Sequence, residues 1–237
     1  LENIIKNQSR ITGLAIEFHD CDLMIEKIKL FIEGFNLDLV HIHVNNYGII
    51  NKNNFPTVIE LTFSQKKYNS VIVGSKDDIN RIPEIDILVE NNQIWKADNF
   101  EAKIFHIPGH TKGHICFYFF KDKFIFTGDT LFSLGCGRIF EGTHQEMFNS
   151  LKKIKNLPED TKIYCGHEYT LQNSKFCIKH DSSNSNLKKK ILEINDKLKN
   201  NLPTIPSTIK DELECNIFLR ANNVESFSKL RDLKDNF

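Results

Sequence analysis

Residues 108–130 read PGHTKGHICFYFFKDKFIFTGDT, with a histidine-containing segment at one end and an aspartate at the other. The middle is rich in aromatic and β-branched residues and predicts two strands, Ile115–Phe120 and Lys123–Thr127. Lys121-Asp122 between them predicts a hairpin turn. Gly109 and Gly128 indicate that the backbone bends tightly at both ends. Functional sites of α/β folds lie at strand ends, so this stretch predicts a site at a sheet edge.

The rest of the chain indicates an α/β domain followed by helices. Short β-rich runs predict strands at Ile11–Phe18, Asp38–Val40, Thr57–Phe63, Ser70–Val73, Ile85–Val89, Ala102–Ile107 and Thr161–Cys165. Helical spacing predicts helices at Met24–Phe35 and at Thr143–Lys155, the latter with a Thr143–Glu146 capping box. Further helices are predicted at Leu171–Ile178, Leu187–Leu198 and Ser207–Asn216. We therefore place a boundary near Thr170, between an α/β domain (1–170) and a helical tail (171–237).

The composition gives no reason to expect nucleic acid or a membrane as partner. Lys+Arg and Asp+Glu both number 31, so the formal net charge is zero. No apolar run approaches the roughly 20 residues of a membrane span. The six cysteines form no C-x-x-C pair, which indicates free thiols in a reducing compartment. We expect an intracellular monomer in the cytoplasm, or in an organelle if an N-terminal leader has been removed.

Metal-competent side chains stand at the ends of several predicted strands: His41, His43, His110, Asp129 and His167. His41 and His43 are two apart on an extended segment and project to the same side. Neutral imidazoles with a carboxylate suit zinc, iron or manganese. These residues together predict a metal site.

The remaining histidines are better explained without a metal. A lone histidine is more often a surface or satisfied core residue than a ligand. His114, so close to His110, is expected to support the site by hydrogen bonding. We expect surface or core positions without metal ligation for the other four: His19, His106, His144 and His180.

The blocks around these residues resemble those of glyoxalase II, the hydroxyacylglutathione hydrolases. Four stretches agree in order and spacing: GHTKGHIC (109–116), FTGDTLF (126–132), GCGRIFEGT (135–143) and YCGHEYT (164–170). In the tail, NIFLR (216–220) resembles the family's Asn-Pro-Phe-Leu-Arg, and RDLK (231–234) its closing Arg-x-x-Lys. The resemblance implies a metallo-β-lactamase αβ/βα sandwich with a C-terminal helical domain that helps hold glutathione. It also implies hydrolysis of S-D-lactoylglutathione to D-lactate and glutathione.

The resemblance assigns roles residue by residue. His41, His43 and His110 match the ligands of a first metal, and His167 matches a ligand of a second. Asp129 matches the carboxylate that bridges both metals, and we expect it to orient the attacking water. The positions where the family contacts glutathione, whose carboxylates need cationic partners, are Arg138, Phe140, Tyr169, Arg231 and Lys234.

Asn45 and Asn46 depart from the family's pattern. They replace the Asp-His pair in the family's Thr-His-x-His-x-Asp-His block. A neutral amide is a weak substitute for a carboxylate and an imidazole, so we expect one metal ion rather than two, with zinc ahead of iron and manganese. Phe140 replaces a tyrosine of the family, and Ile49-Ile50 a glycine pair, so ordinary glutathione binding is less well supported.

Three functions are compatible with these residues. The first is a metal-dependent hydrolase of glutathione thioesters or related acyl thioesters, impaired or mononuclear, which explains why first-metal ligands and cations are both present. The second is a catalytically inactive glyoxalase II-like binding protein, favoured by Asn45-Asn46. The third, a β-lactamase or nuclease of the same fold, is disfavoured by the Gly-Cys-Gly-Arg block and the Arg-x-x-Lys tail. We prefer the hydrolase.

Overall fold

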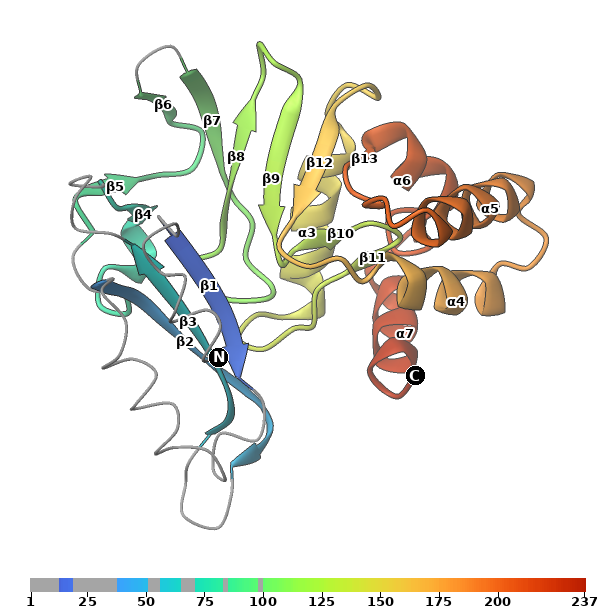
Figure 1. The fold of residues 1–237 in the computed structure, drawn as a ribbon, viewed down its shortest axis with the longest axis horizontal. Coiled ribbons are helices and arrows are strands. Elements are labelled where there is room, and N and C mark those ends of the chain that lie inside the picture. Colours follow the sequence, from blue (N-terminus) through green and yellow to red (C-terminus); the bar gives the residue numbers. More distant parts are fainter. Residues whose placement is uncertain (1–12, 19–37, 51–55, 65–70, 83–84, 98–99) are drawn as a thin grey trace. The chain divides into compact units, whose positions relative to one another are not determined.

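The computed structural model describes residues 13–18, 38–50, 56–64, 71–82, 85–97 and 100–237, with side chains from residue 71 onward (Figure 1). The chain divides into two compact units. The N-terminal unit comprises Leu1–Gly74 and Ile79–Leu88, and the main unit comprises Ser75–Asp78 and Val89–Phe237.

The N-terminal unit contains an antiparallel three-stranded sheet in the order β1-β3-β2. Its strands are β1 (Gly13–Phe18), β2 (Asp38–Ile50) and β3 (Pro56–Ser64). All three were predicted, although β2 is longer than the expected Asp38–Val40. The predicted helix at Met24–Phe35 lies outside the described residues.

The main unit contains a six-stranded sheet in the order β13-β12-β9-β8-β7-β6. Neighbouring strands are antiparallel except β12 and β9, which are parallel. The hairpin predicted at residues 115–127 is confirmed as β8 and β9. The exposed edge strand β6 was not predicted. The strands are β6 (Ile94–Ala97), β7 (Phe100–His106), β8 (Ile115–Phe119), β9 (Phe124–Gly128), β12 (Lys162–Cys165) and β13 (Ser207–Thr208).

Two further two-stranded pairs lie outside the six-stranded sheet. The pair β4 (Val73–Ser75) and β5 (Ile87–Val89) flanks the 3₁₀ turn η3 (Lys76–Asp78). A second pair, β10 (Leu131–Phe132) and β11 (Gly135–Cys136), follows β9 directly.

Five described helices belong to the main unit: α3 (His144–Lys155), α4 (Thr170–His180), α5 (Ser185–Lys199), α6 (Ile209–Cys215) and α7 (Val224–Asp235). The predicted capping box is confirmed, because Thr143 accepts from the backbone of Glu146 and the Glu146 side chain bonds back to Thr143. Figure 1 shows α4–α7 gathered near the β12–β13 edge of the sheet. Sequence periodicity did not predict α7.

One hydrophobic core joins the sheet of the main unit to its helices. Ile107 and Ile125 from the sheet region are fully buried with Met147 of α3 and with Phe176 and Phe227 of the tail helices. Each such side chain contributes roughly 1.5–3 kcal/mol by burial. The change from sheet to helices falls at Thr170, where α4 begins. A domain boundary at that residue stays a prediction, since side chains on both sides share this core.

The described cysteines fit the expectation of free thiols. Cys116, Cys136, Cys165, Cys177 and Cys215 form no disulfide, and Cys21 lies outside the described residues. Burial raises the pKa of Cys116 and of Cys177 to about 12, so both remain thiols. Within the described ranges, no helix has the length and apolar character needed to cross a membrane.

Candidate active site

Asp129 stands at a tight turn directly after β9. Gly128 has a φ of +50°, a conformation that favours glycine, and an added Cβ there would lie 2.5 Å from His114 Nε2. Gly128 also pairs with Cys165 of β12 at a register shift, and the Gly166 N–H donates to the Gly128 carbonyl at 2.9 Å. Because β9 and β12 are parallel, they end at the same edge of the sheet and bring the segments of Asp129 and His167 together.

Two imidazoles converge on one oxygen of Asp129. His110 Nε2 lies 3.4 Å and His167 Nε2 lies 3.5 Å from Asp129 Oδ2. His110 is oriented through its Nδ1, which is 2.9 Å from the Arg138 carbonyl oxygen. A carbonyl accepts but cannot donate, so Nδ1 carries a proton and Nε2 of a neutral His110 presents its lone pair. This is the tautomer that a metal ligand requires.

Asp129 is held in its ionised form. Burial is the largest influence on this carboxyl and by itself would raise its pKa. When His110 and His167 are protonated, their hydrogen bonds and positive charge outweigh burial and lower the pKa of Asp129 well below its usual range. A carboxylate at this position can bind a cation or orient a water.

His114 supports the turn rather than the cluster itself. Its Nε2 accepts the backbone N–H of Asp129 at 3.2 Å, and its Nδ1 lies 3.4 Å from Thr111 Oγ1. Since Nε2 accepts, the proton is on Nδ1, which donates to the Thr111 hydroxyl. The arrangement agrees with the predicted role of His114 as a hydrogen-bonding support.

Glycines allow other segments to pack against this turn. A Cβ at Gly137 would lie 1.8 Å from the Asp129 carbonyl oxygen, and a Cβ at Gly166 would lie 2.4 Å from Asp129 Oδ1. Gly109, before His110, has a φ of +149° and packs against Met147. The tight turns predicted at Gly109 and Gly128 are both confirmed.

The donors around Asp129 fit a divalent metal ion. Two imidazole nitrogens and a carboxylate are borderline ligands that suit zinc, iron or manganese. The bare Nε2 of a neutral His110 and a carboxylate oxygen are both acceptors, and a shared cation would satisfy them together. Within the part of the chain whose side chains are described, no group of three His, Cys, Asp or Glu residues is arranged to hold a metal ion, so the fit rests on the donor types of His110, Asp129 and His167.

His41 and His43 belong to β2 of the N-terminal unit, where the structure gives the backbone register only. Their positions pair with Thr62 and Glu60 of β3. The ligand roles of both histidines, and the effect of Asn45-Asn46, stay predictions.

The cations predicted to contact glutathione lie around the last turns of α7. Arg138 Nε is 3.6 Å and Arg231 Nη2 is 3.0 Å from the same Asp235 oxygen. Burial, and then the positive charges of Arg231 and Arg138, lower the pKa of Lys234. Arg138 and Arg231 thus share one oxygen of Asp235, and Lys234 lies within electrostatic reach of both guanidinium groups.

Arg231 differs from its neighbours because it is buried, at 2% exposed. Its Nη1 donates to the Cys136 carbonyl at 2.7 Å, and its guanidinium lies over the Phe218 ring. Lys234 is half-buried, with Nζ 5.1 Å from the centre of the Phe176 ring. The structure thus gives Arg231 an internal packing role, and its contact with glutathione stays a prediction.

Aromatic rings flank both imidazoles. The centroid of Phe140 is 4.6 Å from that of His110, and Tyr169 stacks on His167 at 5.1 Å with an interplanar angle of 16°. Tyr169 is 45% exposed. Phe140 provides an apolar surface where the resembled family has a hydroxyl. Contacts of these two residues with substrate stay predictions.

The other described histidines have local partners. His106 Nε2 lies 2.6 Å from the Lys112 carbonyl oxygen, and His144 Nε2 lies 3.1 Å from Asp232 Oδ1. The ring of His180 packs against Phe176. These contacts agree with the predicted structural roles, and His19 lies outside the described residues.

Sequence reasoning missed three buried polar residues that bond to the backbone after Asp129. Asn173, Glu212 and Asn216 lie on or next to the tail helices and bond to the backbone of Ser133, Leu134 and Gly135. Asn216 opens the NIFLR block, which was the available signal. Glu212 lies three residues from both Ile209 and Cys215 on the buried face of α6, but a glutamate is a residue type that is rarely expected to be buried.

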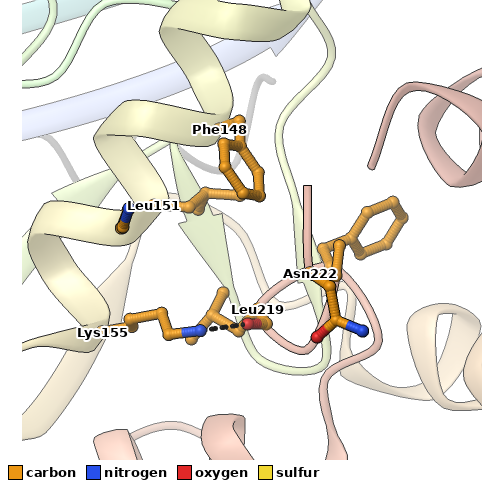
Figure 2. Close-up of a pocket in the computed structure, with 8 residues that line it drawn as sticks. Phe148, Leu151, Lys155, Leu219 and Asn222 are labelled. Atoms are coloured by element: carbon orange, nitrogen blue, oxygen red, sulfur yellow. Dashed lines mark hydrogen bonds between the residues drawn. The ribbon is translucent and has the colours of Figure 1, made fainter. Parts of the chain in front are cut away.

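A small cavity lies between α3 and residues 218–222 (Figure 2). Its volume is about 150 Å³, and Lys155 Nζ at its wall donates to the Leu219 carbonyl at 2.9 Å. The lining contains no imidazole or carboxylate, so it offers no ligands for a metal of the kind described above. The lining residues are Phe148, Leu151, Lys152, Lys155, Phe218, Leu219, Ala221 and Asn222.

Known protein families match both the sheet-containing part of this chain and its C-terminal helical part. The metallo-beta-lactamase superfamily model matches residues 62–167, and the hydroxyacylglutathione hydrolase C-terminus model matches residues 168–237. The chain is 70% identical over 173 residues to a hydroxyacylglutathione hydrolase of Pelagibacter ubique (strain HTCC1062), covering 73% of this chain and 72% of that protein. It is 40% identical over 187 residues to the hydroxyacylglutathione hydrolase of Chelativorans sp. (strain BNC1), covering 73% of each.

A solved structure shows the shared fold. ETHE1 from Myxococcus xanthus superposes with a TM-score of 0.51 at 20% identity, over 70% of this chain and 59% of that chain. The predicted metallo-β-lactamase fold is confirmed. The family models include His110, Asp129 and His167 and begin after residues 41–46. The chain belongs to the hydroxyacylglutathione hydrolase, or glyoxalase II, family of the metallo-β-lactamase superfamily.

Proposed function

We propose that this chain hydrolyses S-D-lactoylglutathione or a closely related glutathione thioester at the Asp129 cluster. The observation that carries the proposal is the convergence of His110 and His167 on one oxygen of Asp129, at 3.4 and 3.5 Å. These three residues would hold the metal, with His41 and His43 as further ligands predicted from the sequence. A bound metal ion supplies Lewis acidity, which acidifies water and polarises a carbonyl.

The chain's own residues would orient the reactants. Asp129, ionised because of its two imidazole neighbours, accepts a hydrogen bond from the attacking water and directs it toward the thioester carbonyl carbon. A C–O bond forms and the C–S bond breaks, so that D-lactate and the glutathione thiolate leave. The two protons of the attacking water pass to solvent, and the thiolate takes up one proton from solvent. Arg138 and Lys234 are placed to pair with the carboxylates of glutathione.

The metal content follows from the ligand types. We propose one zinc ion rather than two, because Asn45-Asn46 stand where the family's private ligands of the second metal are expected. Iron and manganese fit the same donors. The free thiols of the described residues suit a reducing compartment such as the cytoplasm.

Asn45-Asn46 and Phe140 favour a second candidate, a glutathione-binding protein without turnover. The two functions separate when turnover of S-D-lactoylglutathione and equilibrium binding of S-methylglutathione are measured on the same preparation. The wild type and the double variant Asn45→Asp, Asn46→His are compared, with Asp160→Asn as an exposed-surface control. Turnover in the wild type supports the hydrolase. Binding without turnover in the wild type, with turnover in the double variant, supports the binding protein.

A further inference from the structure

The loop that follows Asp129 is held along its backbone by side chains of the C-terminal helices. This loop, the 131–137 hairpin, consists of β10, β11, the turn between them and Gly137. Hydrogen bonds from α4, from the C-cap residue of α6 and from α7 reach four consecutive carbonyls. They run from Asn173 Nδ2 to Ser133 (3.0 Å), Cys177 Sγ to Leu134 (3.1 Å), Asn216 Nδ2 to Gly135 (3.1 Å) and Arg231 Nη1 to Cys136 (2.7 Å).

Glu212 of α6 supplies an acceptor to the same hairpin. Its side chain is fully buried, and its Oε2 accepts from the Leu134 N–H at 2.9 Å and from Asn216 Nδ2 at 2.8 Å. Leu134 has a φ of +59°, a left-handed conformation that a side chain disfavours and that surrounding bonds must maintain. The Glu212 carboxyl therefore holds the most constrained residue of the turn.

The other end of the 131–137 hairpin contacts the site. The Gly137 N–H donates to the Thr130 carbonyl at 3.1 Å, and Gly137 is so close to Asp129 that a Cβ would lie 1.8 Å from its carbonyl oxygen. The next carbonyl, that of Arg138, receives His110 Nδ1. A displacement at Leu134 is thus transmitted through packed backbone to both Asp129 and His110.

We propose that Glu212 is a positioning residue for hydrolysis. Its buried carboxyl fixes the 131–137 hairpin and, through that hairpin, the separation of Asp129, His110 and Arg138. Glu212 touches no reacting atom in this arrangement. The inference rests on the proposed function, because it assigns Glu212 a part in that reaction.

Three variants test the proposal. Glu212→Ala removes both bonds, Glu212→Gln keeps an amide oxygen that can accept them, and Glu214→Gln changes a partly exposed carboxylate on the same helix as a control. We would measure kcat and KM with S-D-lactoylglutathione well below the lowest Tm. Amide hydrogen exchange of the peptide spanning 129–138 would be followed in the same proteins, with β7 and β8 as the reference. If Glu212→Ala does not fold, Glu212→Met fills the same space without accepting a bond.

A positioning role predicts that Glu212→Ala lowers kcat/KM on the order of tenfold or more, because catalytic geometry is sensitive to small displacements. Exchange in residues 129–138 rises while the reference strands are unchanged, and Glu212→Gln restores both properties to within about threefold of the wild type. A lower Tm with unchanged kcat, KM and 129–138 exchange would overturn the proposal. If the wild type shows no turnover, the proposed function is contradicted. In that case, unchanged hydrogen exchange of residues 129–138 in Glu212→Ala would also overturn the proposal that Glu212 fixes the 131–137 hairpin.

Discussion

The two compact units carry predicted ligands of the same chemical type but in different surroundings. In the main unit, His110 and Asp129 follow glycines at positive φ, and His114, the Arg138 carbonyl and Gly137 hold them from several directions. In the N-terminal unit, His41 and His43 stand in strand β2, directly after a register shift between Leu39 and His41, and Asn45-Asn46 follow in the same strand. The family models match residues 62–237 and so include the first group alone. The structure therefore shows supporting backbone contacts for the predicted ligands of the main unit and only the strand register for those of the N-terminal unit.

Replacing one ligand from each unit tests this comparison most strongly. If the predicted ligand sets act together, His110→Ala and His41→Ala both lower metal affinity on the order of 100-fold or more, because each removes a ligand. His180→Ala, whose ring packs against Phe176, serves as the control. Metal affinity is measured by competition with a chromogenic chelator. Wild-type affinity in His41→Ala would confine the ligands to the main unit.

Gly137→Ala tests the close approach in the main unit. The new Cβ would collide with the Asp129 carbonyl oxygen, a backbone atom that cannot rotate away. We expect kcat/KM to fall roughly 100-fold, since a displacement of about 1 Å at a catalytic group has an effect of this size. Steady-state kinetics with near-ultraviolet circular dichroism as a folding check measures it. Unchanged kinetics in a folded variant would show that Gly137 does not constrain Asp129.

The buried carboxyl of Glu212 makes the main unit sensitive to pH. Burial is the largest influence and raises the pKa of Glu212 to about 7, from 4.5 in an exposed chain. The folded state therefore holds this proton more tightly than the unfolded state. Its contribution to stability is complete below about pH 4.5, declines as the pH rises, and is lost above about pH 7, a change of roughly 3 kcal/mol.

Urea unfolding between pH 4.5 and 8 measures this change, and Glu212→Gln should remove it while Glu214→Gln keeps it. The other ionisable groups that interact with Glu212 are Asp211 and Cys215 of α6, Cys165 of β12 and Cys177 of α4. The three thiols have raised pKa values, at about 11 for Cys165 and about 12 for the others, so they stay neutral over this range. An identical pH dependence in Glu212→Gln would assign the effect to another group.

The smallest expected effect is at the start of α3. Thr143→Ala removes the side-chain oxygen that accepts the Glu146 N–H and should lower the free energy of unfolding by about 1 kcal/mol. Turnover per folded chain should stay unchanged, because the Thr143 side chain bonds to Glu146 of its own helix. Chemical denaturation and kinetics on one preparation check both parts. A loss of turnover at full folding would connect this cap to the site.

Sequence patterns predicted most of the regular elements and the residues that converge on Asp129. The β8–β9 hairpin and the Thr143 cap follow from local rules, and Gly128 before Asp129 marks its turn. Helix α7 was not predicted from the sequence, because its buried face includes Arg231, a residue type that periodicity assigns to the surface. The hydrogen bond of Glu212 was not predicted either, because its partner is the backbone N–H of Leu134, and side-chain patterns carry no information about backbone partners.

We propose that the Asp129 cluster binds the metal at which the thioester is hydrolysed. Elemental analysis of zinc, iron and manganese per chain in the wild type and in Asp129→Asn, with turnover of S-D-lactoylglutathione in the same samples, tests this. We expect about one ion per wild-type chain with turnover, and loss of both in the variant, because a carboxylate that binds a cation is replaced by an amide. Equal metal content and equal turnover in the two proteins would contradict it.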